Sequence, residues 1–146
     1  MGPSPTPYRG RVLSVYLLDT TVLIGYLRGT DDVAPGLLQL LADGHTLATS
    51  CVNLAEVERG LRTRERKRGE ALTDRLRFLV TDREAARRAG RYQSDWSRRG
   101  RTIHTADALI AGTARTHGAV LVTHNLADFP MRDVRVESLA EGPAGG

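Results

Sequence analysis

The first strongly apolar stretch of the chain changes its hydrophobic period within a few residues. Residues 14–20, "SVYLLDT", form an almost continuous run of strand-forming residues, and residues 21–29, "TVLIGYLRG", place apolar side chains at helical spacing before a glycine. An apolar run without polar alternation is typical of a strand buried on both faces, as in a parallel sheet. We therefore predict a buried strand that is followed directly by a helix.

The same succession of strand and helix continues along the chain. A helix over residues 33–43, with Pro35 in its first turn, precedes a short strand at "TLATS", residues 46–50. Strands separated by helices indicate a parallel sheet covered on both faces, hence an α/β fold. Four further helices are predicted over residues 52–62, 64–80, 82–100 and 104–118, and two further strands over 119–125 and 134–139. The second of these helices carries the apolar stripe Leu72, Leu76 and Leu79. The third has Asp82 as N-cap, and the fourth runs from a Thr105 N-cap to Gly118.

A chain of 146 residues fits a single domain, which we expect to span residues 14–140. The proline-rich residues 1–13 are interpreted as a flexible leader or a cloning remnant, and residues 141–146 as a flexible tail. No segment reads as a signal peptide or a transmembrane span, so no membrane partner is expected. The single Cys51 cannot form an internal disulfide, which favours a reducing, cytoplasmic compartment.

Charge is distributed unevenly along the chain. The net charge is +4, yet the segment from Arg59 to Arg101 holds 15 Lys and Arg residues against 6 acids. Lys67 is the only lysine, and the planar guanidinium of arginine binds phosphate in a bidentate manner. The segment therefore suits a phosphate-bearing ligand, and a solvated basic face without a ligand is the alternative.

Four acids follow or flank the predicted strands, and they carry the candidate chemistry. Asp19 ends the first strand, where a buried carboxylate is costly unless something pairs with it. Glu56, Asp107 and Asp128 leave later elements that reach the same edge of a parallel sheet, which is the edge where such folds bind ligands. Mg²⁺ or Mn²⁺ takes carboxylates and waters as ligands, and a metal-activated water can attack a phosphodiester.

Three motif-bearing segments follow one another along the chain: "LLDTTVLIGYL", "TSCVNLAEVERGL" and "HTADALIAGTARTHGAVLVTHNLADF". In this order they resemble the PIN-domain ribonucleases, specifically the VapC toxins of type II toxin-antitoxin systems. The resemblance spans Val15 to Phe129. It implies a three-layer α/β/α sandwich with a central parallel sheet of about five strands. It also implies a Mg²⁺- or Mn²⁺-dependent endoribonuclease that forms a homodimer and is neutralised by a VapB-type antitoxin in a hetero-oligomer.

The resemblance assigns roles to individual residues. Asp19 and Asp107 would be direct or water-bridged metal ligands, Glu56 would hold the metal waters and orient the nucleophile, and Asp128 would complete the acidic quartet. Four further residues match positions that support these acids by hydrogen bonds: Thr20, Asn53, Thr123 and Asn125.

Arginines near the motifs are candidates for holding RNA beside the acids. Arg99 and Arg101 flank the Asp107 motif, and we expect them to contact phosphate. The arginine-rich helices could equally bind the antitoxin or a second protomer, and exposed leucines, Tyr92 and Trp96 would favour such a protein interface.

Two other function classes fit an acid at a strand end less well. A haloacid-dehalogenase-like phosphoacceptor needs a second Asp two residues after the first, where this chain has Thr21, and a receiver-like domain needs a lysine after its fifth strand. A catalytically silent module that binds RNA or protein through its arginines would have no need for several unpaired acids at one sheet edge.

Overall fold

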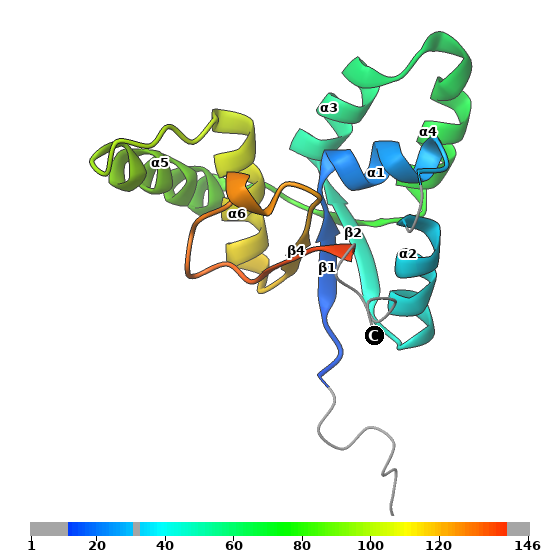
Figure 1. Cartoon of the computed structure of the whole chain (residues 1–146), viewed down its shortest axis with the longest axis horizontal. Helices are drawn as coiled ribbons and strands as arrows, with labels where there is room; N and C mark the ends of the chain where they lie inside the picture. The colour runs from blue at the N-terminus through cyan, green and yellow to red at the C-terminus, as the bar shows by residue number, and fades with distance from the viewer. Residues whose placement is uncertain (1–11, 31–32, 140–146) are drawn as a thin grey trace, which may run out of the picture.

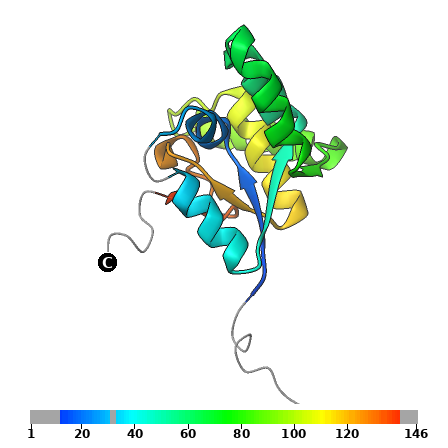
Figure 2. The ribbon, with the colours of Figure 1, turned by 90° about the vertical axis from the view of Figure 1, so that its right-hand side faces the viewer.

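A sheet of five parallel strands lies at the centre of the part of the protein described in the computed structural model, residues 12–30 and 33–139 (Figure 1). Because every pairing is parallel, all strands end at one edge of the sheet, called the carboxyl edge below; Figure 2 shows the β1 and β2 arrows pointing the same way. The strands are β1 (Val15–Leu18), β2 (Thr46–Ser50), β3 (Arg77–Leu79), β4 (Val120–Val122) and β5 (Val136–Glu137), in the order β3-β2-β1-β4-β5.

Helices cover both faces of the sheet. Four helices lie on one side and two on the other, so the predicted three-layer α/β/α sandwich is confirmed (Figure 1). The first group consists of α1 (Thr20–Leu27), α2 (Val33–Ala42), α3 (Cys51–Gly60) and α4 (Arg66–Asp74), and the second of α5 (Arg83–Ser97) and α6 (Thr105–His117). The short helix η2 (Thr63–Glu65) lies between α3 and α4 in sequence, and η3 (Leu126–Asp128) lies between β4 and β5.

The apolar run of β1 feeds two separate cores because successive strand side chains point to opposite faces. Leu17 packs into the core beneath α5 and α6, whereas Tyr16 and Leu18 pack into the core beneath α1, α2 and α3. All three side chains are at least 93% buried. A strand at the centre of a two-sided sheet therefore has no solvent face, which explains its lack of polar alternation.

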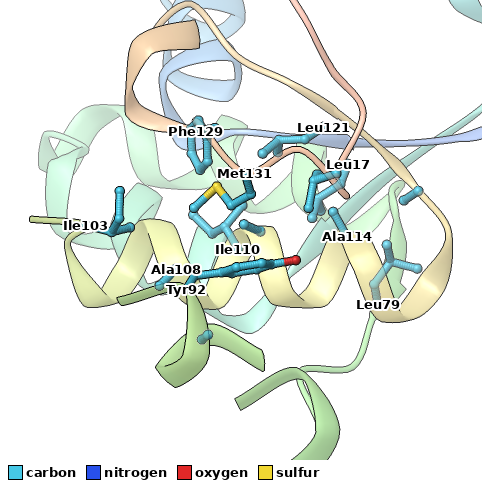
Figure 3. Close-up of a cluster of buried hydrophobic side chains, with 14 of the residues drawn as sticks. Leu17, Leu79, Tyr92, Ile103, Ala108, Ile110, Ala114, Leu121, Phe129 and Met131 are labelled. Atoms are coloured by element: carbon cyan, nitrogen blue, oxygen red, sulfur yellow. The ribbon is translucent and has the colours of Figure 1, made fainter. Parts of the chain in front are cut away.

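Tyr92 belongs to the core beneath α5 and α6, so it does not supply the exposed aromatic ring that would have favoured a protein interface (Figure 3). Only 7% of Tyr92 is exposed, and its hydroxyl donates a hydrogen bond of 2.9 Å to Asp133. Burial is the main reason that the pKa of Tyr92 lies far above its ordinary value, and the hydrogen bond to Asp133 raises it further. Trp96 is partly buried against the same core, so neither aromatic ring is a free anchor for a protein partner.

The predicted helix over residues 64–80 is wrong in its second half. Helix α4 ends at Asp74, and Arg77–Leu79 forms the edge strand β3 instead. Pairing with β2 brings Leu79 opposite Ser50 and buries it, while Arg77 and Phe78 stay exposed. A three-residue strand with one buried side chain is too short to show strand periodicity. Leu79 also fits the helical stripe of Leu72 and Leu76, which is why the pattern predicted a helix there.

Most other predicted boundaries are close to those observed. Asp82 caps α5 by accepting a hydrogen bond of 2.9 Å from the Ala85 N–H, as expected. Gly118 ends α6 in the left-handed conformation at φ 64°, as its position predicted. Thr105, expected to be the N-cap, is the first residue of α6, and His104 occupies the cap position without a side-chain hydrogen bond.

The predicted leader and tail fall largely beyond the described residues: 1–11 and 141–146 lie outside them. Within the part that the structure describes, none of the helices is both long and apolar enough to cross a membrane.

Helices α5 and α6 pack closely at Gly112, which gives a test of this layer. A Cβ at Gly112 would collide with the backbone carbonyl oxygen of Ala85, which cannot rotate away. We expect Gly112→Ala to lower the free energy of unfolding by about 2 kcal/mol, measured by urea denaturation. Gly90→Ala is the matched control on α5, because nothing lies within 4 Å of its Cβ position, and it should raise stability by about 0.5–1 kcal/mol. Equal urea midpoints for Gly112→Ala and the unmodified protein would contradict this packing.

Candidate active site

Asp19 lies at the carboxyl edge, between the end of β1 and the start of α1, and is only 5% exposed. Its backbone N–H donates to Val122 on the neighbouring strand, at 2.8 Å. One carboxylate oxygen accepts from the backbone N–H of Thr20 at 2.9 Å. The other accepts from the hydroxyls of Thr123 at 2.8 Å and Thr21 at 3.3 Å. Three donors thus hold this buried carboxylate in one orientation.

The pKa of Asp19 is raised above its usual value of 3.8, chiefly because burial disfavours the charged form. The hydrogen bonds from Thr123, Thr20 and Thr21 act in the opposite direction, and the negative charge of Glu56 adds to the rise. The positive end of α1 also favours an anion at its N-cap. Asp19 is therefore a carboxylate that would gain free energy from a nearby cation.

Glu56 reaches the carboxyl edge from α3 and is held there by a chain of hydrogen bonds. Its Oε1 accepts from the Thr20 hydroxyl at 2.6 Å, and that hydroxyl accepts from the Asn53 amide at 3.3 Å. The Asn53 carbonyl in turn accepts from the Ser50 hydroxyl at 2.6 Å. Asn53 and Ser50 are fully buried. Since each hydroxyl has one proton, the chain runs in one direction and ends on the Glu56 carboxylate.

Asp107 lies in the first turn of α6 and is half-buried. Its pKa is raised from 3.8 to about 6, first by burial and then by the negative charges of Asp19, Asp128 and Glu56; the nearby His104 opposes the rise. The structure thus brings the four predicted acids close enough for three of them to disfavour ionisation of the fourth.

Asp128 is the most exposed of the four acids and lies on η3 beyond β4. Its backbone N–H donates to the Asn125 carbonyl at 2.9 Å, and the Asn125 N–H donates to the Thr123 hydroxyl at 2.9 Å. Thr123 therefore connects this loop to Asp19. Asn125 makes this contact through its backbone, whereas its side chain is exposed.

The donor set at this edge fits a hard divalent cation. All four acids offer carboxylate oxygens, which are the ligands that Mg²⁺ and Mn²⁺ prefer. Within residues 12–30 and 33–139 no three His, Cys, Asp or Glu side chains converge tightly enough to form a ready metal cage. The acids come from four different segments of the chain: the end of β1, α3, α6 and η3.

Comparison with known families matches residues 16–133 to the PIN domain. The chain belongs to the PIN domain family. Two relatives from Mycobacterium tuberculosis are named ribonuclease VapC10 and ribonuclease VapC19. VapC10 is 37% identical over 79% of this chain and 86% of its own length, and VapC19 is 33% identical over 79% and 92%. The family predicted from the motif order is thereby confirmed.

A solved structure shows the same fold. The crystal structure of DNA-bound VapBC from Salmonella typhimurium aligns with a TM-score of 0.75 at 25% identity, covering 88% of this chain and 99% of the other.

Two arginines of this PIN domain stack on one tryptophan near the acids. The guanidinium of Arg99 lies 4.7 Å from the centre of the Trp96 ring, and that of Arg101 lies 5.9 Å from it. Both belong to the loop between α5 and α6, which leads into the helix that carries Asp107. Stacking limits the motion of both side chains. That they bind RNA stays a prediction.

Two residues that help to position the acids of this PIN domain were not singled out from the sequence: Ser50, which acts through Asn53 and Thr20, and Thr21, which acts directly. Ser50 caps α3 and begins the hydrogen-bond chain to Glu56, and Thr21 contacts Asp19 directly. A serine directly before a helical run is a favoured N-cap, so that signal was present for Ser50. Thr21 lies two residues from Asp19, but side chains two apart on a helix do not usually face each other.

The raised pKa of Asp107 predicts how the metal-free protein responds to pH. Because the folded-state pKa exceeds the usual value, ionising Asp107 costs the folded state free energy as pH rises from about 4 to above 6. Asp107→Asn removes that cost. In buffer with EDTA, the variant should gain about 1 kcal/mol of stability relative to the unmodified protein between pH 4 and pH 7, after allowing for solvent screening of a half-exposed group.

The measurement is urea denaturation at several pH values. Asp74→Asn is the matched control, since it makes the same substitution at an exposed position at the end of α4. A difference for Asp107→Asn that stays constant with pH would show that the other acids do not repel its charge.

Proposed function

We propose that this protein is a Mg²⁺- or Mn²⁺-dependent endoribonuclease and the toxin of a type II toxin-antitoxin pair, with residues 14–140 as its catalytic domain. The observation that carries the proposal is the group of four acids at the carboxyl edge, where Asp19, Asp128 and Glu56 raise the pKa of Asp107. Membership of the PIN domain family and relatives named ribonuclease VapC support it. The free thiol of Cys51 is compatible with action in the cytoplasm.

In this proposal the acids divide into metal holders and a water-orienting group. Asp19 and Asp107 hold the metal directly or through water, and Asp128 completes the set from the more exposed side. When bound, the metal supplies an activated water and offsets the charge that develops on the phosphate.

Glu56 is the group best placed to orient the attacking water. The Thr20 hydroxyl already binds its Oε1, so the other carboxylate oxygen is left to accept a proton or a water. Asn53 fixes the Thr20 hydroxyl, and Thr123 fixes Asp19. These neutral donors position the acids without adding charge. They thereby preserve the negative potential that attracts a cation.

A protein partner is supported by the structural neighbours and by one apolar surface. The Salmonella typhimurium structure is a VapBC assembly. In this chain, α2 and α4 line a hollow of about 800 Å³ in which Leu38 and Leu41 are 62% and 51% exposed. Exposed leucines around a hollow of this size are typical of protein interfaces. We propose a VapB-type antitoxin as the partner, and a homodimer within the hetero-oligomer.

The nuclease proposal predicts the effect of removing one metal-holding charge. Asp19→Asn keeps the shape of the side chain but loses its charge, so it should reduce RNA cleavage in Mg²⁺ or Mn²⁺ by about a hundredfold or more. Cleavage of a total RNA preparation, followed on denaturing gels with and without EDTA, measures this. Circular dichroism of the variant checks that the fold is kept.

Asp74→Asn serves again as control and should cut at the rate of the unmodified protein. Undiminished cleavage by Asp19→Asn would show that Asp19 does not hold the catalytic metal. The nuclease proposal itself fails if the folded, antitoxin-free protein cuts no RNA with either metal.

A further inference from the structure

The outer face of α5 carries arginines at every fourth residue. Arg83, Arg87 and Arg91 are all exposed, and we call these three the α5 ridge. They line a surface groove of about 460 Å³ together with Glu84 and Arg88. Four residues rise about 6 Å along a helix, so the ridge presents three guanidinium groups over about 12 Å.

The ridge points away from the protein because the opposite face of α5 is buried. Ala85, Ala89 and Tyr92 pack into the core beneath α5 and α6. With 3.6 residues per turn, Arg83, Arg87 and Arg91 fall on the far side of the helix from these three. No part of the described fold covers the ridge, and α5 lies at the outer margin of the molecule (Figure 1).

The three arginines of the ridge outnumber Glu84, the one acid that lines their groove, and none of them forms an ion pair within the described residues. Elsewhere on α5 the arginines are paired: Arg88 with Asp133 at 3.3 Å, and Arg98 with Asp95 at 3.1 Å. Across the described ranges no carboxylate lies within ion-pairing distance of Arg83, Arg87 or Arg91.

A hydrogen-bond donor beside the ridge is also unsatisfied. Arg88, which lines the same groove, has a buried Nε without an acceptor among the described residues. The groove thus offers unpaired positive charge, and its lining arginines include one unpaired donor.

The residues that line the groove favour a polyanion over a protein as its ligand. Protein interfaces have apolar or aromatic centres, but the groove is lined only by arginines and one glutamate. Guanidinium groups bind phosphate oxygens in a bidentate manner, and nucleic acids present phosphates in a regular row. The C-terminal end of α5 leads through Arg98, Arg99 and Arg101 into the helix that carries Asp107, so the positive charge extends along the chain towards the acids.

We propose that the α5 ridge binds the phosphate backbone of the RNA substrate at a distance from the bond that is cut. The inference rests on the proposed ribonuclease activity and specifies its substrate: an RNA that extends beyond the acidic site and along α5. The ridge adds affinity without taking part in the chemistry.

The test measures the salt dependence of RNA binding in the Asp19→Asn background, where the probe is not cut. The probe is a fluorescein-labelled 30-nucleotide oligouridylate, followed by anisotropy over a series of KCl concentrations. The triple variant Arg83→Gln, Arg87→Gln and Arg91→Gln should bind more weakly at low salt. Its slope of log K against log salt should be shallower by about 2, because each phosphate contact on a single strand contributes about 0.7.

A matched triple variant separates local binding from net charge. Arg64→Gln, Lys67→Gln and Arg75→Gln removes the same charge from exposed positions around α4, on the other side of the molecule (Figure 1). It should leave the slope unchanged.

The outcomes also separate this inference from the nuclease proposal. If the protein with Asp19 intact cuts RNA but the ridge variant keeps the full slope, the ridge proposal is wrong and the nuclease proposal stands. Equal losses in both triple variants would likewise overturn it, since net charge alone would explain them. If the ridge variant keeps RNA binding but loses an acidic protein partner, the occupant is a protein instead.

Discussion

The structure depends on holding one buried carboxylate, that of Asp19, in place without a positive side chain. Burial disfavours its charge, and the compensation comes from a backbone N–H and two hydroxyls. The Thr123 hydroxyl can reach it only because β1 and β4 pair in parallel, with Leu18 opposite Val122. The orientation of the Asp19 carboxylate therefore depends on the register between β1 and β4.

The same edge gathers the starts of three helices. Asp19 caps α1, Ser50 caps α3, and Asp107 lies in the first turn of α6. Helix N-termini carry partial positive charge, which lowers the cost of placing acids beside one another. Burial, followed by repulsion from the other acids, still raises the pKa of Asp107 to about 6, so the helices moderate the acidic cluster without neutralising it. A divalent cation would complete that neutralisation.

The sequence predicted the layers of the fold, and the four acids that it singled out lie close enough in the structure to influence the pKa of Asp107. The apolar run at 14–20 and the N-cap of α5 reflect burial and local hydrogen bonding, which a single sequence displays. The edge strand β3 was missed because three residues with one buried side chain carry little pattern, so four strands were predicted from the pattern and a sheet of about five only from the resemblance. The burial of Tyr92 and its hydrogen bond to Asp133, 41 residues away, could not be predicted from the arginine-rich sequence around it.

The hydrogen bond between Thr123 and Asp19 spans 104 positions along the chain, and this separation bears on how the protein is made. The N-terminal half of the chain leaves the ribosome first and holds Asp19, Glu56 and the hydroxyls of Thr20 and Thr21, but not that of Thr123. It lacks β4, whose pairing covers one side of β1, and α6, which supplies Asp107. Domains fold as units once their contacts are complete, and contacts between distant residues form late. A nascent chain therefore has no assembled acidic site until β4, α6 and η3 have been synthesised.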